Sequence, residues 1–323
     1  MTMDADQIVD RRRLRRKLSF WRVLAFLFAA VAIIGVIIAS TPDTLIGPAR
    51  NHVARVTLNG VIVEDRRFEQ MLGRIAKNNA AKALIVSINS PGGTTAGSEA
   101  VYEAIRKVAD KKPVVAQIGT VAASGGYAAA IAADHIVARR TSITGSIGVL
   151  FQWADIHELL GEIGVQYETV KSGPLKAEPN PFEPTPEAAR EAVEATVMDS
   201  YDWFVGLVAD RRELKPGEAR KLADGRIYSG GQALDLKLVD ALGGEDAARD
   251  WLASEHGIRR SLGVREWNPE RTLRNVGLSE TAAWLARVAG FDLIAQILEV
   301  GARRGVAGLD GLVSVWQPQD VEK

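Results

Sequence analysis

Two short segments of the sequence place small residues beside groups that can take part in acyl transfer. Ser90-Pro91-Gly92-Gly93 follows an apolar run, and its glycines would let backbone N–H groups face a cavity and stabilise an oxyanion. Ser124 lies in the second segment, Val121 to Tyr127, where a hydroxyl near a helix start can project into a site. Taken alone, such segments are more often a plain strand-to-helix turn and an N-cap. The second segment also differs from the G-x-S-x-G elbow, because alanine occupies the first glycine position.

A nucleophilic serine needs a base, because a free hydroxyl is a poor nucleophile. Histidine is one choice, and the chain has four of them, His52, His135, His157 and His256. The run that starts at His157, H-E-L-L-G, lacks the second histidine of a zinc protease helix. Lysine is the other choice, provided that burial lowers its pKa enough to leave it neutral. The residues alone leave both choices open, since spacing does not select one lysine among many.

Three stretches of the chain resemble the signatures of the signal peptide peptidase A family. They are NSPGG at 89–93, VAASGGYAAAIAADHIVARRTSITGSIGV at 121–149 and VKSGPLKAEPNPFEP at 170–184. The stretches occur in the order expected for this family, and the resemblance covers about residues 53 to 245. Together the three motifs are specific, whereas the glycine motif alone is weak.

The resemblance implies a Ser-Lys peptidase and gives roles to five residues. Ser124 would be the nucleophile, and Lys176, the second lysine of the K-S-G-x-x-K stretch, would be the general base. Ser146, in T-G-S-I-G-V, would hydrogen-bond the lysine amine and so orient it. The backbone amides of Gly93 and Gly125 would form the oxyanion hole. A site of this type implies neither a metal ion nor a cofactor.

The third signature also holds the obvious alternative to Lys176. Lys171 lies five residues earlier in the same loop and is also a candidate base. Ala177 stands where members of the family often carry an acidic residue, which affects the fine contacts of the loop rather than the dyad. The prolines of the loop make it stiff, which would help to hold an amine in one place.

An α/β fold must position these residues, because predicted strands alternate with predicted helices. We expect strands at 52–63, 84–88, 114–118, 136–138 and 147–151, and helices at 67–76, 96–109, 122–133 and 186–209. The five prolines from Lys171 to Pro186 inclusive predict an irregular loop. The resemblance implies a Clp/crotonase-like core of repeated β-β-α units in a single copy. It further implies a ring-like homo-oligomer in which adjoining protomers supply the serine and the lysine of each dyad.

The N-terminus predicts a membrane anchor. A basic cluster from Arg11 to Lys17 precedes an uncharged apolar run from Val23 to Ala39, and with the adjoining aromatic residues the segment is long enough to cross a bilayer. We predict a cytoplasmic basic N-terminus at 1–20, a transmembrane anchor in the lipid bilayer at 21–40, a linker at 41–52, a peptidase domain at 53–258 and a mainly helical C-terminal extension at 259–323. The basic flank predicts that the remainder of this single-pass protein lies outside the cytoplasm. With the resemblance, we expect a protein of the bacterial inner membrane whose catalytic domain is on the extracytoplasmic (periplasmic) side. A cleaved signal peptide is the alternative, but no clean Ala-x-Ala site follows the apolar run.

Composition sets the remaining limits on function. Lys plus Arg and Asp plus Glu each number 40, so the chain has no excess of positive charge that would favour a nucleic acid partner. The absence of cysteine excludes thiol catalysis and disulfides. Within these limits, the resemblance implies a membrane-anchored serine endopeptidase that degrades released signal peptides and other extended apolar peptides. The alternatives are a crotonase-type acyl-CoA enzyme, which would not need Ser124, and a non-catalytic membrane scaffold of the same fold.

Overall fold

The computed structural model describes residues 17, 20–24, 26–27, 50–269 and 313–315, and it divides the chain into two units, 1–50 and 51–323. In the first unit the described residues between 17 and 27 are helical, and the exposed rings of Phe20 and Trp21 meet edge to face with centroids 6.1 Å apart. Among the described residues, no helix has both the length and the hydropathy needed to cross a membrane. Most of the predicted anchor at 21–40 lies outside the described residues.

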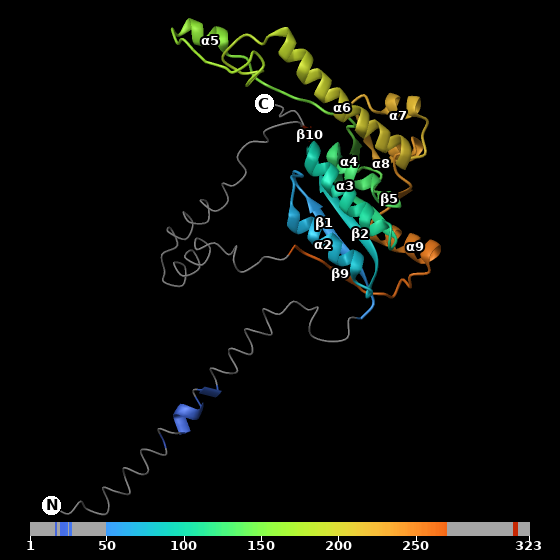
Figure 1. Ribbon diagram of the computed structural model, residues 1–323. Coiled ribbons are helices and arrows are strands. Elements are labelled where there is room, and N and C mark those ends of the chain that lie inside the picture. Colours follow the sequence, from blue (N-terminus) through green and yellow to red (C-terminus); the bar gives the residue numbers. More distant parts are fainter. Residues whose placement is uncertain (1–16, 18–19, 25, 28–49, 270–312, 316–323) are drawn as a thin grey trace, which may run out of the picture. The chain divides into compact units, whose positions relative to one another are not determined.

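The second unit is built on a mixed β-sheet with parallel central strands (Figure 1). The strand order is β7-β6-β4-β2-β1-β9, with β5 paired to β4 and β8 paired to β5. The pair β6–β7 is antiparallel. The strands are β1 (His52–Asn59), β2 (Ala81–Ser90), β4 (Val114–Ala123), β5 (His135–Ala138), β6 (Ile143–Gly145), β7 (Ile227–Ser229), β8 (Ala241–Leu242) and β9 (Val264–Glu266). The α/β class predicted from the sequence is therefore confirmed.

Helices cover both faces of this sheet. Alternate residues of β2 show the two faces, because Leu84 and Val86 belong to the larger apolar core whereas Ala83 and Ile85 belong to the smaller one. The smaller core is closed by α9 (Glu245–His256). The larger core is closed by α2 (Arg66–Lys77), α3 (Thr95–Ala109), α4 (Gly125–Ile131) and α6 (Glu187–Arg211). Because both faces are covered, the strands read as continuous apolar runs rather than as alternating ones.

Most helix predictions agree with the structure to within two residues, as α2, α3 and α6 show. α2 and α3 begin where Asp65 and Thr94 accept hydrogen bonds from amides of the first turn. The strand predicted at 147–151 is wrong, because the strand at this place, β6, ends at Gly145. Ser146 follows with a φ of +48°, a left-handed conformation that a β-strand cannot continue through.

The chain after α6 completes the sheet with α7 (Pro216–Leu222), α8 (Gly230–Asp235) and the strands β7, β8 and β9. β9 lies within the segment predicted as a mainly helical extension, and it pairs in parallel with β1, Val264 opposite Val53. An ion pair across the two strands, Arg55 Nε to Glu266 Oε2 at 2.5 Å, favours this pairing. Residues 270–312 and 316–323 of the predicted extension lie outside the described residues.

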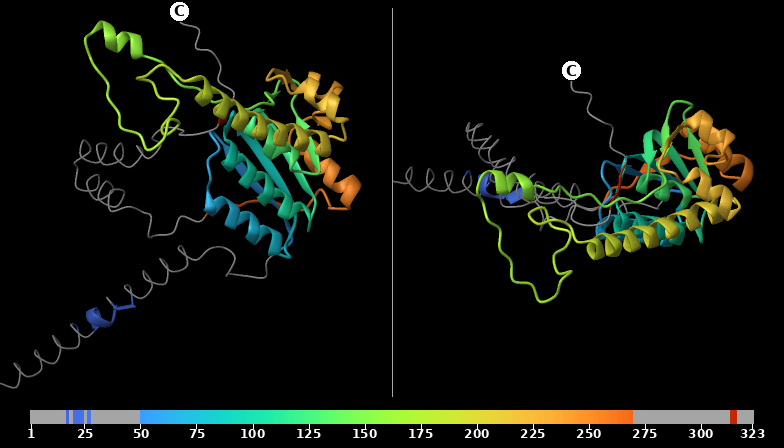
Figure 2. Two further views of the ribbon diagram at one scale, coloured as in Figure 1. Left: turned by 45° about the horizontal axis from the view of Figure 1, so that its top comes forward. Right: turned by 90° about the horizontal axis from the view of Figure 1, so that it is seen from above.

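An arm formed by residues 151–186 projects from the sheet and carries α5 (His157–Glu162) (Figures 1 and 2). Its two limbs are joined by hydrogen bonds from Ile156 N–H to Pro181 O at 2.8 Å and from Trp153 Nε1 to Thr185 Oγ1 at 3.0 Å. Large apolar side chains remain exposed along it, namely Leu159, Ile163, Val165, Val170 and Leu175. The arm thus makes its own internal contacts while presenting apolar surface to its surroundings.

A second, two-stranded sheet lies just past the carboxyl end of β2. β3 (Gly92–Thr94) pairs with β10 (Val313–Val315) in antiparallel fashion, Gly93 opposite Ser314. On the β3 side, Ile62 forms a parallel bridge with Gly93, in which Ile62 N–H donates to Gly92 O at 2.8 Å. β3, the glycine strand, is therefore paired on both of its edges, with β10 on one side and with Ile62 on the other.

Candidate active site

Ser124 occupies a sharp turn between β4 and α4. Its φ of 54° and ψ of −122° are unfavourable for a residue with a side chain, so the turn is strained, as turns at nucleophiles commonly are. The residue is 2% exposed, and its N–H donates to Gly145 O at 2.8 Å. The backbone therefore has the character of a nucleophile elbow although Ala122 stands where that motif has glycine. Ala122 is accommodated as a buried residue of β4, opposite Thr144 of β6.

The residues after Ser124 must be glycines because other backbone and side-chain atoms approach them closely. A Cβ at Gly125 would lie 2.1 Å from Ser98 Oγ, and one at Gly126 would lie 2.6 Å from Ser90 O. Ser98 belongs to α3 and Ser90 ends β2, so the start of α4 is wedged between these two elements. Sequence analysis did not single out Ser98. The signal that could have found it is the pairing of a Gly-Gly dipeptide with a small residue in the first turn of the preceding helix.

Gly93 lies next to this turn. A Cβ at Gly93 would lie 1.8 Å from Ile62 O, so a side chain has no room there. The amide nitrogen of Gly93 is 3.3 Å from the point where a Cβ of Gly125 would stand. The structure thus brings together the two backbones, at Gly93 and Gly125, whose amides the resemblance assigns to an oxyanion hole.

Ser146 is brought to the same end of the sheet. β4 and β6 pair in parallel with Ala123 opposite Gly145, so Ser124 and Ser146 are the next residues of two neighbouring strands. Ser146 is partly buried, has a φ of +48°, and donates its N–H to Arg226 O at 2.8 Å. Two serines with left-handed backbone conformations therefore leave the sheet side by side.

Lys176 lies apart from these residues, exposed on the arm. Within the described part of a single chain, no hydrogen bond or ion pair joins its amine to Ser124 or Ser146. Its N–H donates to Gly173 O at 3.1 Å in a turn, and Ala177 follows with a φ of +66°. One chain thus assembles Ser124, Ser146, Gly93 and Gly125 but does not add the predicted base to them.

Lys171 is excluded as the base by its partners. Its amine forms ion pairs with both Glu178 and Glu183. The hydrogen bond to Glu178, followed by that to Glu183, raises the pKa of Lys171 above its ordinary value. A lysine held in its charged form cannot accept the proton of a serine hydroxyl. Of the two lysines in the third signature, Lys176 is the one without such a pair among the described contacts.

The histidines do not form a triad with Ser124. His52 and His135 open β1 and β5, so they lie at the amino end of a parallel sheet whose carboxyl end carries Ser124. His135 stacks on Trp251 with centroids 4.8 Å apart, and burial lowers its pKa. His157 lies on the arm, where its Nδ1 is 2.5 Å from Asp155 Oδ1. The histidine alternative left open by the sequence is therefore not realised in the chain.

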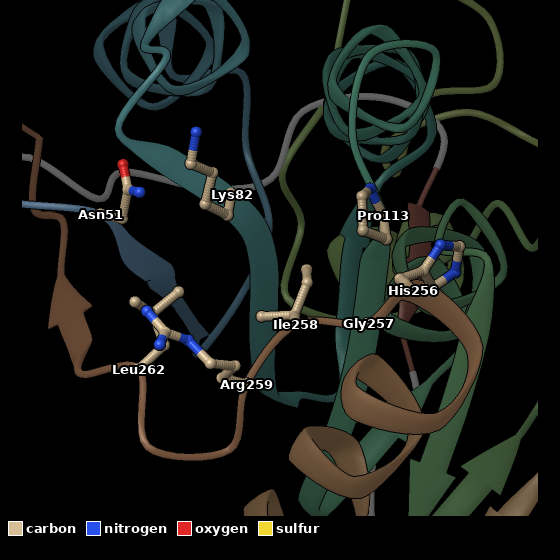
Figure 3. Close-up of a pocket in the computed structure, with 8 residues that line it drawn as sticks. All are labelled: Asn51, Lys82, Pro113, His256, Gly257, Ile258, Arg259 and Leu262. Carbon is tan, nitrogen blue, oxygen red and sulfur yellow. The ribbon is translucent and has the colours of Figure 1, made fainter.

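A hollow of about 400 Å³ also lies at the amino end of the sheet, lined by the start of β2, the residue before β4 and the end of α9 (Figure 3). It contains three side chains that can carry positive charge, from Lys82, His256 and Arg259. In Figure 3 the side chains of Lys82, Arg259 and His256 lie at separate places around the hollow rather than meeting at one centre. The hollow is thus separate from Ser124 and has no converging set of ligands.

Two family models match the chain. The model of peptidase family S49 matches residues 106–259, and that of the Clp protease matches residues 59–152. The second match spans β2, β3, α3, β4, α4, β5 and β6, the elements that place Ser124, Gly93 and Gly125. The fold and the turn at Ser124 therefore define a serine peptidase with a Clp protease-like α/β fold.

Three relatives specify the family. A candidate protease of Synechocystis sp. is 37% identical over 210 residues, which cover 65% of this chain and 76% of that protein. A candidate signal peptide peptidase SppA of Enterococcus faecium is 33% identical over 225 residues, which cover 65% of each chain. Protease 4 of Haemophilus influenzae is 31% identical over 244 residues, which cover 72% of this chain and 39% of that protein. The chain belongs to the SppA family of serine peptidases, peptidase family S49. It spans less than two thirds of the length of the latter two relatives.

Proposed function

We propose that this protein is a membrane-anchored endopeptidase with a Ser124–Lys176 dyad that degrades released signal peptides and other extended apolar peptides. The observation that carries the proposal is the buried, strained turn at Ser124 beside the backbones of Gly93 and Gly125. A crotonase-type acyl-CoA enzyme would have no use for the strain at Ser124, and membership of a serine peptidase family favours the peptidase.

In the proposed reaction, neutral Lys176 takes the proton of the Ser124 hydroxyl while the oxygen attacks the carbonyl carbon of a peptide bond. Amides of Gly93 and Gly125 stabilise the resulting oxyanion, and Ser146 orients the lysine amine. Protonated Lys176 then gives its proton to the leaving amine, which leaves an ester on Ser124. Water hydrolyses this ester by the same steps, and the enzyme is restored.

We propose that the lysine comes from a neighbouring copy in a homo-oligomeric ring. Two observations support this arrangement. First, Lys176 sits on an arm whose described hydrogen bonds hold the two limbs of the arm to each other. Second, the arm exposes apolar side chains such as Ile163, 64% exposed, and Leu159, 55% exposed, which a second copy would cover. A partner's arm laid over the turn at Ser124 would exclude water and deliver the amine together.

The glycine strand supports the proposed class of substrate. β3 already pairs with an extended segment of the chain, β10, in antiparallel fashion. A peptide substrate would bind in the same way, by main-chain hydrogen bonds to β3, which hold the peptide extended next to Ser124. Released signal peptides are apolar and lack tertiary structure, so they meet both requirements of such a binding edge.

The proposed location follows from the N-terminal sequence. A transmembrane anchor at 21–40, preceded by basic residues, would keep residues 1–20 in the cytoplasm and the peptidase unit on the extracytoplasmic side of the bacterial inner membrane. Protease added to spheroplasts should then digest the peptidase unit. Protection of that unit while the membrane is intact would contradict this location.

A subunit-mixing experiment tests the dyad and its sharing together. Purified Ser124→Ala and Lys176→Ala proteins should each fail to cleave a fluorogenic apolar peptide, and co-assembled mixtures should regain partial activity. Lys221→Ala, which removes an exposed lysine of α7, is the matched control and should behave as wild type. Turnover at the wild-type rate by Ser124→Ala would refute the nucleophile. Mixed oligomers, verified by mass spectrometry, that stay inactive would refute sharing.

A further inference from the structure

A compact polar cluster closes the loop of the arm on which Lys176 lies. Its centre is Lys171, whose amine pairs with Glu178 and Glu183. Asn180 Nδ2 donates to both carboxylates, at 2.9 Å to Glu178 Oε1 and 2.9 Å to Glu183 Oε2. Thr169 Oγ1 donates to the remaining oxygen of Glu183 at 3.1 Å. The cluster therefore ties the start of the loop, at 169–171, to its end, at 178–183.

The cluster is more enclosed than its position on an arm would suggest. The side chain of Glu178 is 2% exposed and that of Lys171 is 19% exposed, and Asn180 is buried. A buried carboxylate is costly unless a cation or donors satisfy it. Lys171, followed by Asn180, lowers the pKa of Glu183 to about 2, and its carboxylate partners raise the pKa of Lys171, so the Glu183 carboxylate and the Lys171 amine hold each other in their charged forms. Two carboxylates thus share one amine in the cluster.

Lys176 lies inside the loop that this cluster closes. It is two residues before Glu178, and the intervening Ala177 has a φ of +66°. The turn is held by hydrogen bonds from Lys176 N–H to Gly173 O at 3.1 Å and from Glu178 N–H to Leu175 O at 3.3 Å. A flexible lysine so close in sequence to two carboxylates would pair with them if they were not already occupied.

We propose that Lys171 is a positioning residue which occupies Glu178 and Glu183 and thereby leaves the amine of Lys176 unpaired for the partner's site. The inference rests on the proposed function, because it assigns a role relative to Lys176 as base. If Lys171 were removed, two uncompensated carboxylates would attract Lys176, hold its amine away from the serine and favour its charged form. Loss of Lys171 would then affect proton transfer and not simply the fold of the arm.

Further charged groups lie near the loop, among them Glu168, which precedes Thr169 and is exposed. The limb that packs on it through Ile156 carries Asp155 and His157, which bond each other. Arg190 of α6 lies over the ring of Trp153, 5.6 Å from its centroid. In the assembled site the proposed neighbour of Lys176 is the uncharged hydroxyl of Ser146. The carboxylates of Glu178 and Glu183 are thus the groups whose charge Lys171 has to offset.

The test is the pH dependence of kcat/KM for the full-length enzyme on a fluorogenic apolar peptide. Lys171→Met should move the acidic limb of the profile upward by about one pH unit or more, the usual effect of an uncompensated opposite charge nearby. Lys171→Arg, which keeps the charge, should restore the wild-type profile. The double variant Lys171→Met with Glu183→Gln, which removes one carboxylate, should return the limb most of the way.

Three outcomes separate a failure of the inference about Lys171 from a failure of the proposed function. A shifted limb that Lys171→Arg and the double variant reverse supports the inference. A Lys171→Met enzyme with lower activity but an unshifted limb would overturn it, since the cluster would then act on the structure of the arm alone. Full activity of Lys176→Ala would instead overturn the proposed function. Size-exclusion chromatography of each variant shows whether the oligomer persists, and Glu183→Gln alone, with Lys171 and Glu178 still paired, should keep the wild-type profile if assembly is intact.

Discussion

Gly125→Ala gives the sharpest test of how tightly the site is built. The new Cβ would lie 2.1 Å from Ser98 Oγ and 3.3 Å from Gly93 N, whereas ordinary contacts begin at 3.4 Å. Either Ser98 or the start of α4 must therefore move by more than 1 Å. Overpacking of this kind costs about 1–3 kcal/mol of the free energy of unfolding. A displacement of about 1 Å between nucleophile and oxyanion donors lowers the rate by about 100-fold.

The structure names the atom responsible, so the effect should be reversible. In Gly125→Ala with Ser98→Ala the nearest remaining atom is the Cβ of residue 98, at 3.0 Å, which requires a shift of only a few tenths of an ångström. We expect kcat/KM for a fluorogenic peptide to recover by about 10-fold over Gly125→Ala. Ser98→Ala alone is the control, and it loses a hydrogen bond to Thr94 O worth about 1 kcal/mol. Equal activity of the single Gly125→Ala variant and the double variant would refute this steric reasoning.

Three further predictions follow from other parts of the structure. A variant that ends before β10 (Val313–Val315) should have a lower KM, because β10 occupies the edge of β3 at which we expect substrates to bind. An unchanged KM in steady-state kinetics would contradict that binding mode. Burial lowers the pKa of His135 below its ordinary 6.5, so below about pH 6.5 the unfolded chain binds more protons than the folded chain and the melting temperature should fall. His135→Phe, which can keep the stack on Trp251, should make the melting temperature in calorimetry depend less on pH. Lys112→Met should lower the free energy of unfolding in urea by about 1–3 kcal/mol, because the amine donates to three carbonyl oxygens at 2.6 to 2.9 Å, whereas the exposed Lys111→Met should have little effect.

Much of the scaffold could be predicted because local pattern and tertiary structure agree there. α2 shows its buried face as Phe68, Met71, Leu72 and Ile75, a helical spacing that the sequence displays directly. The same approach misplaced the strand at 147–151, because an apolar run after Ser146 looks like a strand whether or not the backbone can continue one. Positive φ at a serine leaves no trace in hydrophobic periodicity.

The site residues were predictable only in part, since the motifs identify residues but not their surroundings. The closeness of Gly93 and Gly125 depends on how β3 folds back against Ile62, which no spacing encodes. Lys171 and Lys176 could not be separated by residue type, and partners far along the loop, Glu178 and Glu183, distinguish them. The placement of Lys176 relative to Ser124 stays a prediction, because it depends on contacts between copies of the chain.

The way α4 is buried and hydrogen-bonded has a consequence for which part of the chain can move during a catalytic cycle. All seven of its residues are buried, Tyr127 OH donates to Leu238 O at 2.8 Å, and side chains of Arg106 and Arg211 bond the carbonyls at its end. We expect the amides of such a helix to exchange with solvent only on global opening, whereas an exposed arm can rearrange within about microseconds to milliseconds. We therefore expect Ser124 to stay in place throughout turnover, and a conformational step that limits the rate to belong to the arm.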